Sequence, residues 1–220
     1  MGYKLNFSVI WKNLPLLLKG AWLTVEVSTG AILVAILVGI VMGVAKTSRH
    51  QFLRFPAAWY VEAFRNTPLL IQIFLIYFGL PQIGLKLSPF MSGFAALVLY
   101  TGAYNTEVVR AGLEAIPKGQ IEAARSLGFT EIQTIRYVIV PQAFRISLPA
   151  LSNNFIALLK NSSLVSVIGM VELTFIGNDL TAWTFRAFEV YGAVTVLYLA
   201  LVFSLSWILA IIERRIRLLI

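Results

Sequence analysis

Five runs of about 20 apolar residues restrict the fold of this chain more than any other feature of its sequence. They cover residues 21–45, 57–79, 90–112, 148–170 and 190–212. A helix rises 1.5 Å per residue, so about 20 apolar residues cross the roughly 30 Å of hydrocarbon in a bilayer. The 220 residues are 59% hydrophobic and only 13% charged, a composition outside the range of soluble domains. The sequence therefore predicts an all-α membrane protein, with five transmembrane helices in a single domain over residues 1–220.

The lysines and arginines near the ends of these runs predict the orientation of the chain. Positively charged loops stay on the cytoplasmic side of a membrane, and most of these residues fall on one side: Lys46, Arg49, Arg54, Arg110, Lys118, Arg125, Arg136, Arg145, Arg214, Arg215 and Arg217. We therefore expect an outer N-terminus, a cytoplasmic C-terminus and a cytoplasmic loop over residues 115–145. These flanks carry most of the excess positive charge behind the net charge of +8. Positive flanks of this kind meet anionic lipid, so we expect no nucleic-acid partner.

The sequence carries no pattern that is typical of a catalytic or metal centre. It has no cysteine, which excludes disulfides, thiolate ligands and cysteine nucleophiles. The phosphate-binding pattern Gly-x-x-x-x-Gly-Lys-Ser/Thr is absent. The one histidine, His50, stands beside Arg49 in an expected loop and is interpreted as a solvated surface residue. We therefore predict that the chain is not an enzyme and holds neither a metal nor a cofactor.

A charged passage after the third run is too short and too polar to cross a bilayer. Pro117 suits the first turn of a helix. Ile121, Ala124 and Leu127 then fall on one face of that helix. Gly128 is expected to end the helix in the left-handed conformation. The passage therefore begins with a short helix that presents three apolar side chains.

A second short helix is expected directly after the first. Thr130 followed three residues later by Gln133 is a capping-box pattern, and the apolar stripe that follows is expected to stop at Pro141. From the residues alone, two interpretations stay open: this pair of helices docks on a partner, or it rests on lipid headgroups and on its own protein.

The same passage resembles a motif of a known family. Glu122-Ala123-Ala124, then Gly128, then Val138-Ile139-Val140-Pro141 is similar to the EAA motif in the permease subunits of ATP-binding-cassette importers. That motif has Glu-Ala-Ala, three residues, Gly, nine residues and Ile-x-Leu-Pro, so Val138 and Val140 are conservative departures. The resemblance implies that the passage is a helix that couples the permease to its ATPase, through Ile121, Glu122, Ala123, Ala124, Arg125, Leu127 and Gly128.

Three further stretches, over residues 65–72, 115–120 and 159–164, resemble the branch of these permeases that serves polar amino acids such as histidine, arginine and glutamine. The resemblance covers roughly residues 15–215. It implies a multi-pass protein of the bacterial cytoplasmic membrane that pairs with a second permease, a copy or a close homologue. It also implies two ATPase subunits that hold ATP and Mg, and an external amino-acid-binding protein that delivers the substrate.

Polar residues within the apolar runs are the candidates for substrate contact. An ionised side chain at the centre of a bilayer costs about 2.5–3.5 kcal/mol unless it is paired or hydrated. Helical rise puts Glu107 about 15 Å from Pro117 and Lys160 about 16 Å from Pro149, at the cytoplasmic ends of the two expected helices. Tyr100, Tyr104 and Glu107 share one helix face, and Asn153 and Lys160 are one heptad apart. We expect Lys160 to meet the carboxylate of an amino acid, and Glu107 and the tyrosines to face its cationic end.

Structural interpretations of the same residues stay open. Glu107 and Lys160 can form an ion pair with each other, and Glu62 and Arg65 stand at helical spacing for a second pair.

The triplet Asn66-Thr67-Pro68 predicts an interruption of the second run. The residue before a proline is disfavoured in helical geometry, Thr67 can cap a helix, and Pro68 suits a first helical turn. A helix that starts inside the membrane presents free N–H groups to a carboxylate. Thr67, and Gln72 one turn further on, are therefore added to the candidate substrate contacts. A simple proline kink is the alternative.

Together these observations favour a permease subunit of an ATP-driven importer of polar amino acids, with basic ones such as arginine or histidine preferred because of the intramembrane carboxylates. An ATP-independent channel or an ion-coupled carrier for amino acids is the alternative, and a membrane scaffold without transport activity is a third possibility.

Overall fold

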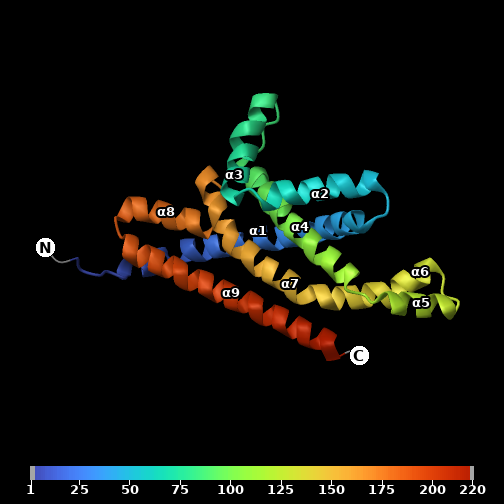
Figure 1. Cartoon of the computed structure of the whole chain (residues 1–220). Coiled ribbons are helices and arrows are strands. Elements are labelled where there is room, and N and C mark those ends of the chain that lie inside the picture. Colours follow the sequence, from blue (N-terminus) through green and yellow to red (C-terminus); the bar gives the residue numbers. More distant parts are fainter. Residues whose placement is uncertain (1–2, 219–220) are drawn as a thin grey trace. The chain divides into compact units, whose positions relative to one another are not determined.

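The computed structural model describes residues 3–218, with side chains for residues 3–216. The described chain is helical, and no strand occurs in it. Figure 1 shows the order of the elements. They are α1 (Ser8–Thr47), α2 (Gln51–Arg65), α3 (Leu69–Phe74), η1 (Leu75–Gly79), η2 (Leu80–Ile83), α4 (Pro89–Glu114), α5 (Lys118–Ser126), α6 (Glu131–Thr134), η3 (Ile135–Ile139), α7 (Val140–Asn161), η4 (Ser162–Ile168), α8 (Leu173–Thr184) and α9 (Ala187–Leu218).

Two helices of the described residues are long and apolar enough to cross a membrane, Ser8–Thr47 and Ala187–Ile216. Up to four spans result if two bent pairs each count as one: Gln51–Arg65 with Leu69–Ile83, and Glu131–Ile168 with Leu173–Thr184. The third expected span corresponds to α4, which is not among these candidates. Its C-terminal half carries polar and charged side chains that lower its mean hydropathy. The membrane-protein class of the fold is supported, and the number of five spans stays a prediction.

The described residues group into two compact units. Unit one comprises Met1–Ile32, Leu69–Leu97 and Ile156–Trp207, and unit two comprises Leu33–Pro68, Val98–Phe155 and Ile208–Ile220. Helices α1, α4, α7 and α9 each contribute to both. The single domain expected from the sequence stays a prediction.

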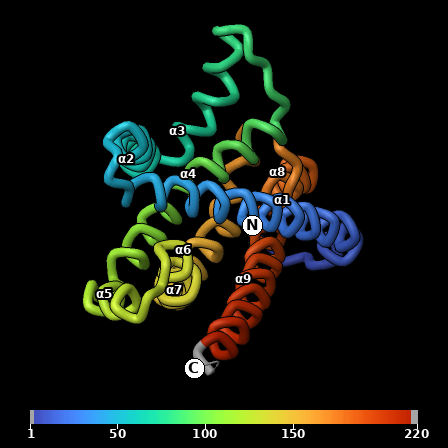
Figure 2. The backbone as a smooth tube through the Cα atoms, turned by 90° about the vertical axis from the view of Figure 1, so that its right-hand side faces the viewer, coloured from blue at the N-terminus to red at the C-terminus, as the bar shows by residue number. Residues whose placement is uncertain are grey.

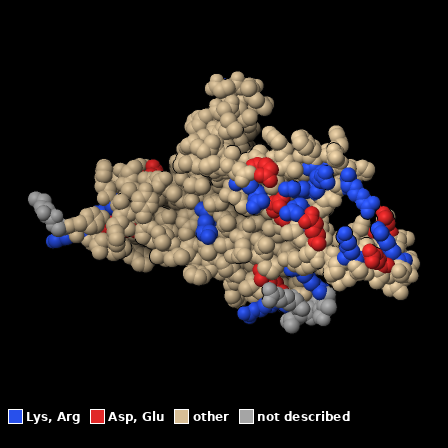
Figure 3. Space-filling view, viewed as in Figure 1, with Lys and Arg blue, Asp and Glu red and all other residues tan. Residues whose placement is uncertain are grey.

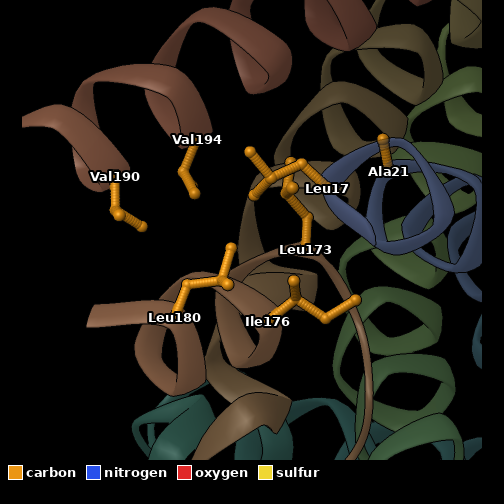
Figure 4. Packing of buried hydrophobic residues seen from close by; sticks show 7 residues of the cluster. All are labelled: Leu17, Ala21, Leu173, Ile176, Leu180, Val190 and Val194. Atoms are coloured by element: carbon orange, nitrogen blue, oxygen red, sulfur yellow. The ribbon is translucent and has the colours of Figure 1, made fainter. Parts of the chain in front are cut away.

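The core of unit one joins the first half of α1 to α8 and to the start of α9. Seven buried side chains from these three helices meet in one cluster (Figure 4): Leu17, Ala21, Leu173, Ile176, Leu180, Val190 and Val194. Gly20 permits the close approach of α8, because a Cβ there would lie 2.9 Å from the Cδ1 atom of Ile176 and 3.0 Å from the Cα atom of Leu173. Burial of such side chains contributes about 1.5–3 kcal/mol each when they leave water, but less in lipid, where close packing matters most.

Unit two is built where α2 returns along the second half of α1. Figures 1 and 2 both draw these two segments side by side. Tyr60 and Val61 of α2 pack with Ala103 of α4. The Tyr60 hydroxyl donates a hydrogen bond to the backbone carbonyl of Leu99, with an O···O distance of 2.6 Å. Gly102 faces these side chains, since a Cβ there would lie 2.8 Å from the Tyr60 hydroxyl.

The interruption expected at the Asn66-Thr67-Pro68 triplet is present. Helix α2 ends at Arg65, and α3 begins at Leu69. The Thr67 hydroxyl donates to the backbone carbonyl of Ala63 over 2.8 Å, so it satisfies one of the free carbonyls at the end of α2. The second run is therefore a broken helix, and the simple kink is excluded.

Pro141 does not stop the second short helix as expected. Its helix continues through the π turn η3 into α7, which contains Pro141 in its first turn. A π turn inserts one extra residue into a helix, so the proline ring escapes the clash with the carbonyl one turn before it. The same device precedes Pro81, where the π turn η1 stands directly before the 3₁₀ helix η2.

Candidate functional site

The helix–glycine–helix passage of unit two has the local geometry that the sequence predicts. Helix α5 ends before Gly128, whose φ of +82° lies in the left-handed region. Thr130 then caps α6: its hydroxyl accepts from the backbone N–H of Gln133 over 3.2 Å, and the Gln133 side chain accepts from the backbone N–H of Thr130 over 2.8 Å. Pro117 precedes the helix as its N-cap residue, one position earlier than expected. Figure 2 shows α5 and α6 side by side.

The surface that this passage offers differs from the expected stripe. Ala124 is buried and Ile121 is half-buried, so the apolar face of α5 covers its own protein. Leu127 keeps 78% of its surface exposed, and Ile132 of α6 matches it at 78%. The expectation that Ala124 is presented to a partner is therefore wrong, because a helix of nine residues has a single apolar face and uses it for packing.

The remaining residues of the expected coupling helix lie on the open side. Glu122, Ala123, Arg125 and Gly128 are all exposed. Arg125 forms a weak ion pair with Glu131 across the turn, with an N···O distance of 3.5 Å. Charged side chains gather over α2, the end of α4, α5 and α6 in Figure 3. Leu127 and Ile132 are thus the two most exposed large apolar side chains of α5, α6 and the turn between them, and they lie within a charged surface.

A network of ion pairs in unit two determines the surroundings of Glu107. Its carboxylate pairs with Lys46 at the end of α1 and accepts two hydrogen bonds from Arg110, at 2.8 Å and 3.1 Å. Arg110 in turn reaches Glu114 at 2.6 Å. Glu107 therefore has partners within its own unit, Lys46 and Arg110. Lys160 belongs to unit one, and its pairing with Glu107 stays a prediction.

Tyr104 and Tyr100, one and two turns along α4 from Glu107, form a cluster with Arg65 of α2. The hydroxyl groups of Tyr100 and Tyr104 are 3.3 Å apart, and their ring centroids are 4.9 Å apart. The Arg65 guanidinium carbon lies 5.0 Å from the centroid of the Tyr104 ring. The open alternative of a Glu62–Arg65 pair is not formed, because the Glu62 carboxylate accepts from the side-chain amide of Asn66 over 2.7 Å. Tyr100, Tyr104 and Glu107 do share a helix face.

A buried amide of α4 was missed by the sequence reasoning. Asn105 is fully buried. Its side-chain amide donates to the backbone carbonyl of Ala35 over 3.2 Å and accepts from the side chain of Asn154 over 3.0 Å. Such bonds fasten helices together within a membrane. Asn153, the residue expected to contact substrate, is exposed beside Asn154. Both Asn105 and Asn154 lie within apolar runs, and this position was the signal in the sequence that could have indicated a hydrogen bond between helices.

Unit one contains the other two candidate substrate contacts. Gln72 of α3 is buried. Lys160, at the end of α7, is exposed and lines a cavity of about 310 Å³ with Ser163, Thr195 and Tyr198. The cavity lies beside α9, and its other walls are apolar. A lone cation among hydroxyl groups suits an anionic group of a small molecule.

Unit one also buries a carboxylate at the start of α8. Glu172 is fully buried and is the N-cap residue of α8. Its carboxylate accepts from the backbone N–H of Phe175 over 2.7 Å, from the Tyr198 hydroxyl over 2.7 Å and from the Thr24 hydroxyl over 3.4 Å. These bonds connect α1, α8 and α9 and give Glu172 a structural role.

Comparisons with known proteins identify the family. Residues 35–218 match the family model described as "Binding-protein-dependent transport system inner membrane component". The chain is 38% identical over 216 residues to the "Glutamine transport system permease protein GlnP" of Escherichia coli (strain K12), which covers 97% of this chain and 99% of the relative. It is 38% identical over 213 residues to the "Octopine transport system permease protein OccM" of Rhizobium meliloti, which covers 93% of this chain and 87% of the relative.

A solved structure agrees with these relatives. The chain superimposes with a TM-score of 0.90 on a chain of the "Crystal structure of an amino acid ABC transporter with histidines", at 39% identity. The superposition covers 97% of this chain and 100% of that one. This chain therefore belongs to the family of inner membrane components of binding-protein-dependent transport systems, the permease subunits of ATP-binding-cassette importers, in which a separate subunit hydrolyses ATP.

Proposed function

We propose that this chain forms the translocation path of an ATP-driven importer of polar amino acids. The observation that carries the proposal is similarity over nearly the whole chain to permeases named for glutamine and octopine, and to an amino-acid transporter whose structure was solved with histidines. The family disfavours the alternative of an ATP-independent channel or an ion-coupled carrier.

The chain acts in a larger assembly. Its partners are two ATPase subunits that hold ATP and Mg, a second permease that is a copy or a close homologue, and an external amino-acid-binding protein. The chain lies in the bacterial cytoplasmic membrane, with its N-terminus outside and its C-terminus in the cytoplasm. Five helices cross the bilayer, and α4 is one of them, because a helix whose polar face lines a hydrated path needs less apolar surface than one surrounded by lipid.

The ATPase docks on the passage from α5 to α6. The exposed pair Leu127 and Ile132 supports this site, since two apolar side chains within a charged surface suit a groove on another protein. Glu122 and Arg125 lie at the rim of the contact. The short capped helices transmit displacement better than a flexible loop would, and Gly128 lets the chain reverse between them.

Substrate contacts are proposed for polar side chains in both units: Thr67, Gln72, Tyr100, Tyr104, Asn153 and Lys160. Lys160 at its cavity is a contact for a carboxylate. Glu107 was expected to attract the cationic end of a basic substrate, but Lys46 and Arg110 already balance its charge. We therefore propose polar amino acids as the substrate class and leave the preference for basic ones to experiment.

Reconstitution tests this proposal. The permease is purified with its ATPase and second permease, placed in liposomes, and supplied with binding protein and with glutamine, histidine or arginine. We expect at least one of these amino acids to stimulate ATP hydrolysis and to accumulate inside. A matched preparation with a hydrolysis-deficient ATPase is expected to lose accumulation. Uptake that persists in that preparation would favour a channel or an ion-coupled carrier instead.

A further inference from the structure

Arg65 has no carboxylate partner among the described residues, unlike the two cations beside Glu107 in unit two. Lys46 and Arg110 both pair with the carboxylate of Glu107, and Arg110 also pairs with Glu114. Among the ion pairs formed by the described residues, none includes Arg65. The guanidinium of Arg65 instead lies over the Tyr104 ring, and the residue is exposed.

The position of Arg65 makes an unpaired charge costly. Helix α2 starts at Gln51, directly after the cytoplasmic loop, and its 1.5 Å rise per residue puts Arg65 about 21 Å along the helix. In the proposed membrane orientation α2 enters the bilayer from the cytoplasmic side, and a charge this far along it needs water or an anion. Arg65 does end α2, where the helix dipole favours a cation, but this gain is smaller than the cost of an unpaired charge at membrane depth. Arg65 is thus best explained if it faces a hydrated path that brings an anion.

The geometry suits a carboxylate. A guanidinium offers two parallel N–H groups that match the two oxygens of a carboxylate. The cation–π contact with Tyr104 restrains the guanidinium, and no carboxylate of the described residues forms an ion pair with its N–H groups. The hydroxyl groups of Tyr100 and Tyr104 lie close together on the same face of α4. Glu107, one turn further on, does not repel an anion, because two cations balance it.

We propose that Arg65, held by Tyr104, binds the α-carboxylate of the transported amino acid. The inference rests on the proposed function. Every amino acid carries this carboxylate, so the site recognises the class of substrate, and the choice among side chains is made elsewhere. Lys160 lines a cavity of its own in unit one.

Binding of amino acids and of their carboxamides tests the proposal directly. The complete importer in lipid nanodiscs is titrated calorimetrically with glutamine, histidine and arginine, and with the three matching amides, which lack the carboxylate. We expect the wild type to bind its preferred amino acid at least about tenfold more tightly than the amide. Arg65→Gln is expected to weaken binding of the acid about tenfold and to leave binding of the amide unchanged, so that the preference disappears.

Two further variants separate recognition from folding. Arg65→Lys keeps the charge but loses the paired N–H groups, so we expect an intermediate preference for the acid. Arg54→Gln removes a cation from the first turn of the same helix, where the residue is exposed, and is expected to bind like the wild type. Basal ATP hydrolysis of each complex reports whether it assembles.

The outcomes distinguish the two proposals. If the wild type binds none of the three amino acids, the proposed function is wrong, and the proposed role of Arg65 is wrong as well. If the wild type binds one of them and Arg65→Gln keeps the full preference for the acid, only the role of Arg65 is overturned. A preference that is lost in Lys160→Met but kept in Arg65→Gln also overturns it.

Discussion

The pair between Lys46 and Glu107 is expected to stabilise unit two measurably. The perturbations are Lys46→Met, Glu107→Gln and the double variant. Lys46→Met keeps most of the aliphatic stem and removes the charge, while Glu107→Gln keeps the shape of the side chain and removes its charge. The two side chains are only 17% and 18% exposed, so solvent screens them less than a surface pair.

The expected magnitudes follow from the partners that each variant leaves behind. Glu107→Gln strands a half-buried ammonium, although Arg110 keeps its bond to Glu114, and we expect a loss of about 2–3 kcal/mol. Lys46→Met costs less, about 1–2 kcal/mol, because Glu107 keeps Arg110. The double variant strands no charge at the pair, so its loss is expected to fall short of the sum of the two single losses by about 1–2 kcal/mol.

Reversible unfolding in mixed micelles, followed by circular dichroism as the fraction of denaturing detergent rises, measures these free energies. Glu114→Gln is the matched control, since its side chain is 55% exposed and its pair with Arg110 is an ordinary contact at i,i+4 spacing. Its loss is expected to be about 0.2–0.5 kcal/mol. A coupling energy between Lys46 and Glu107 below about 0.3 kcal/mol would refute the reasoning, because independent sites add within that margin.

The remaining predictions concern glycines and orientation. Gly39→Ala puts a Cβ 2.5 Å from the Cβ atom of Asn105 and is expected to lower the free energy of unfolding by about 1–3 kcal/mol in the same titration. Gly119→Ala is its control, because a Cβ there has nothing within 4 Å. An equal effect of the two variants would contradict the close packing at Gly39. Gly128→Pro cannot adopt the φ of +82°, so we expect an inserted protein that loses ATPase binding and uptake, and normal uptake would mean that the passage only touches lipid. Ser126→Cys is expected to react with a membrane-impermeant thiol reagent only after the membrane is opened, and Leu87→Cys from outside; the reverse pattern would overturn the orientation.

Features that depend on neighbouring residues could be predicted from the sequence. The left-handed Gly128, the capping box at Thr130 and the break before Pro68 follow from backbone preferences that act within about four residues. The membrane-protein class could be predicted for a similar reason, since the length of each apolar run indicates a membrane helix without knowledge of its neighbours.

Partners far apart in the chain could not be predicted. Lys46 and Glu107 are 61 residues apart, and Thr24 and Glu172 are 148 residues apart. Nothing in the spacing of either pair indicates contact, because the packing of the helices brings each pair together. Similar depths along two helices suggested Lys160 as a partner of Glu107, but depth alone does not indicate which other cations reach the carboxylate, and Lys46 and Arg110 do. Burial of Ala124 was missed likewise, because helical periodicity identifies an apolar face and leaves its partner open.

The π turn η3 shifts the phase of the helix that contains it. One extra residue in a turn rotates every later side chain by about 100° relative to an uninterrupted α-helix. The apolar stripe that starts at Ile132 in α6 therefore does not continue at heptad spacing beyond Val140. A single-residue deletion within η3 would keep the sequence of α7 but turn Asn154 away from Asn105. The length of this turn, as much as the identity of its residues, thus determines which side of α7 carries its polar groups.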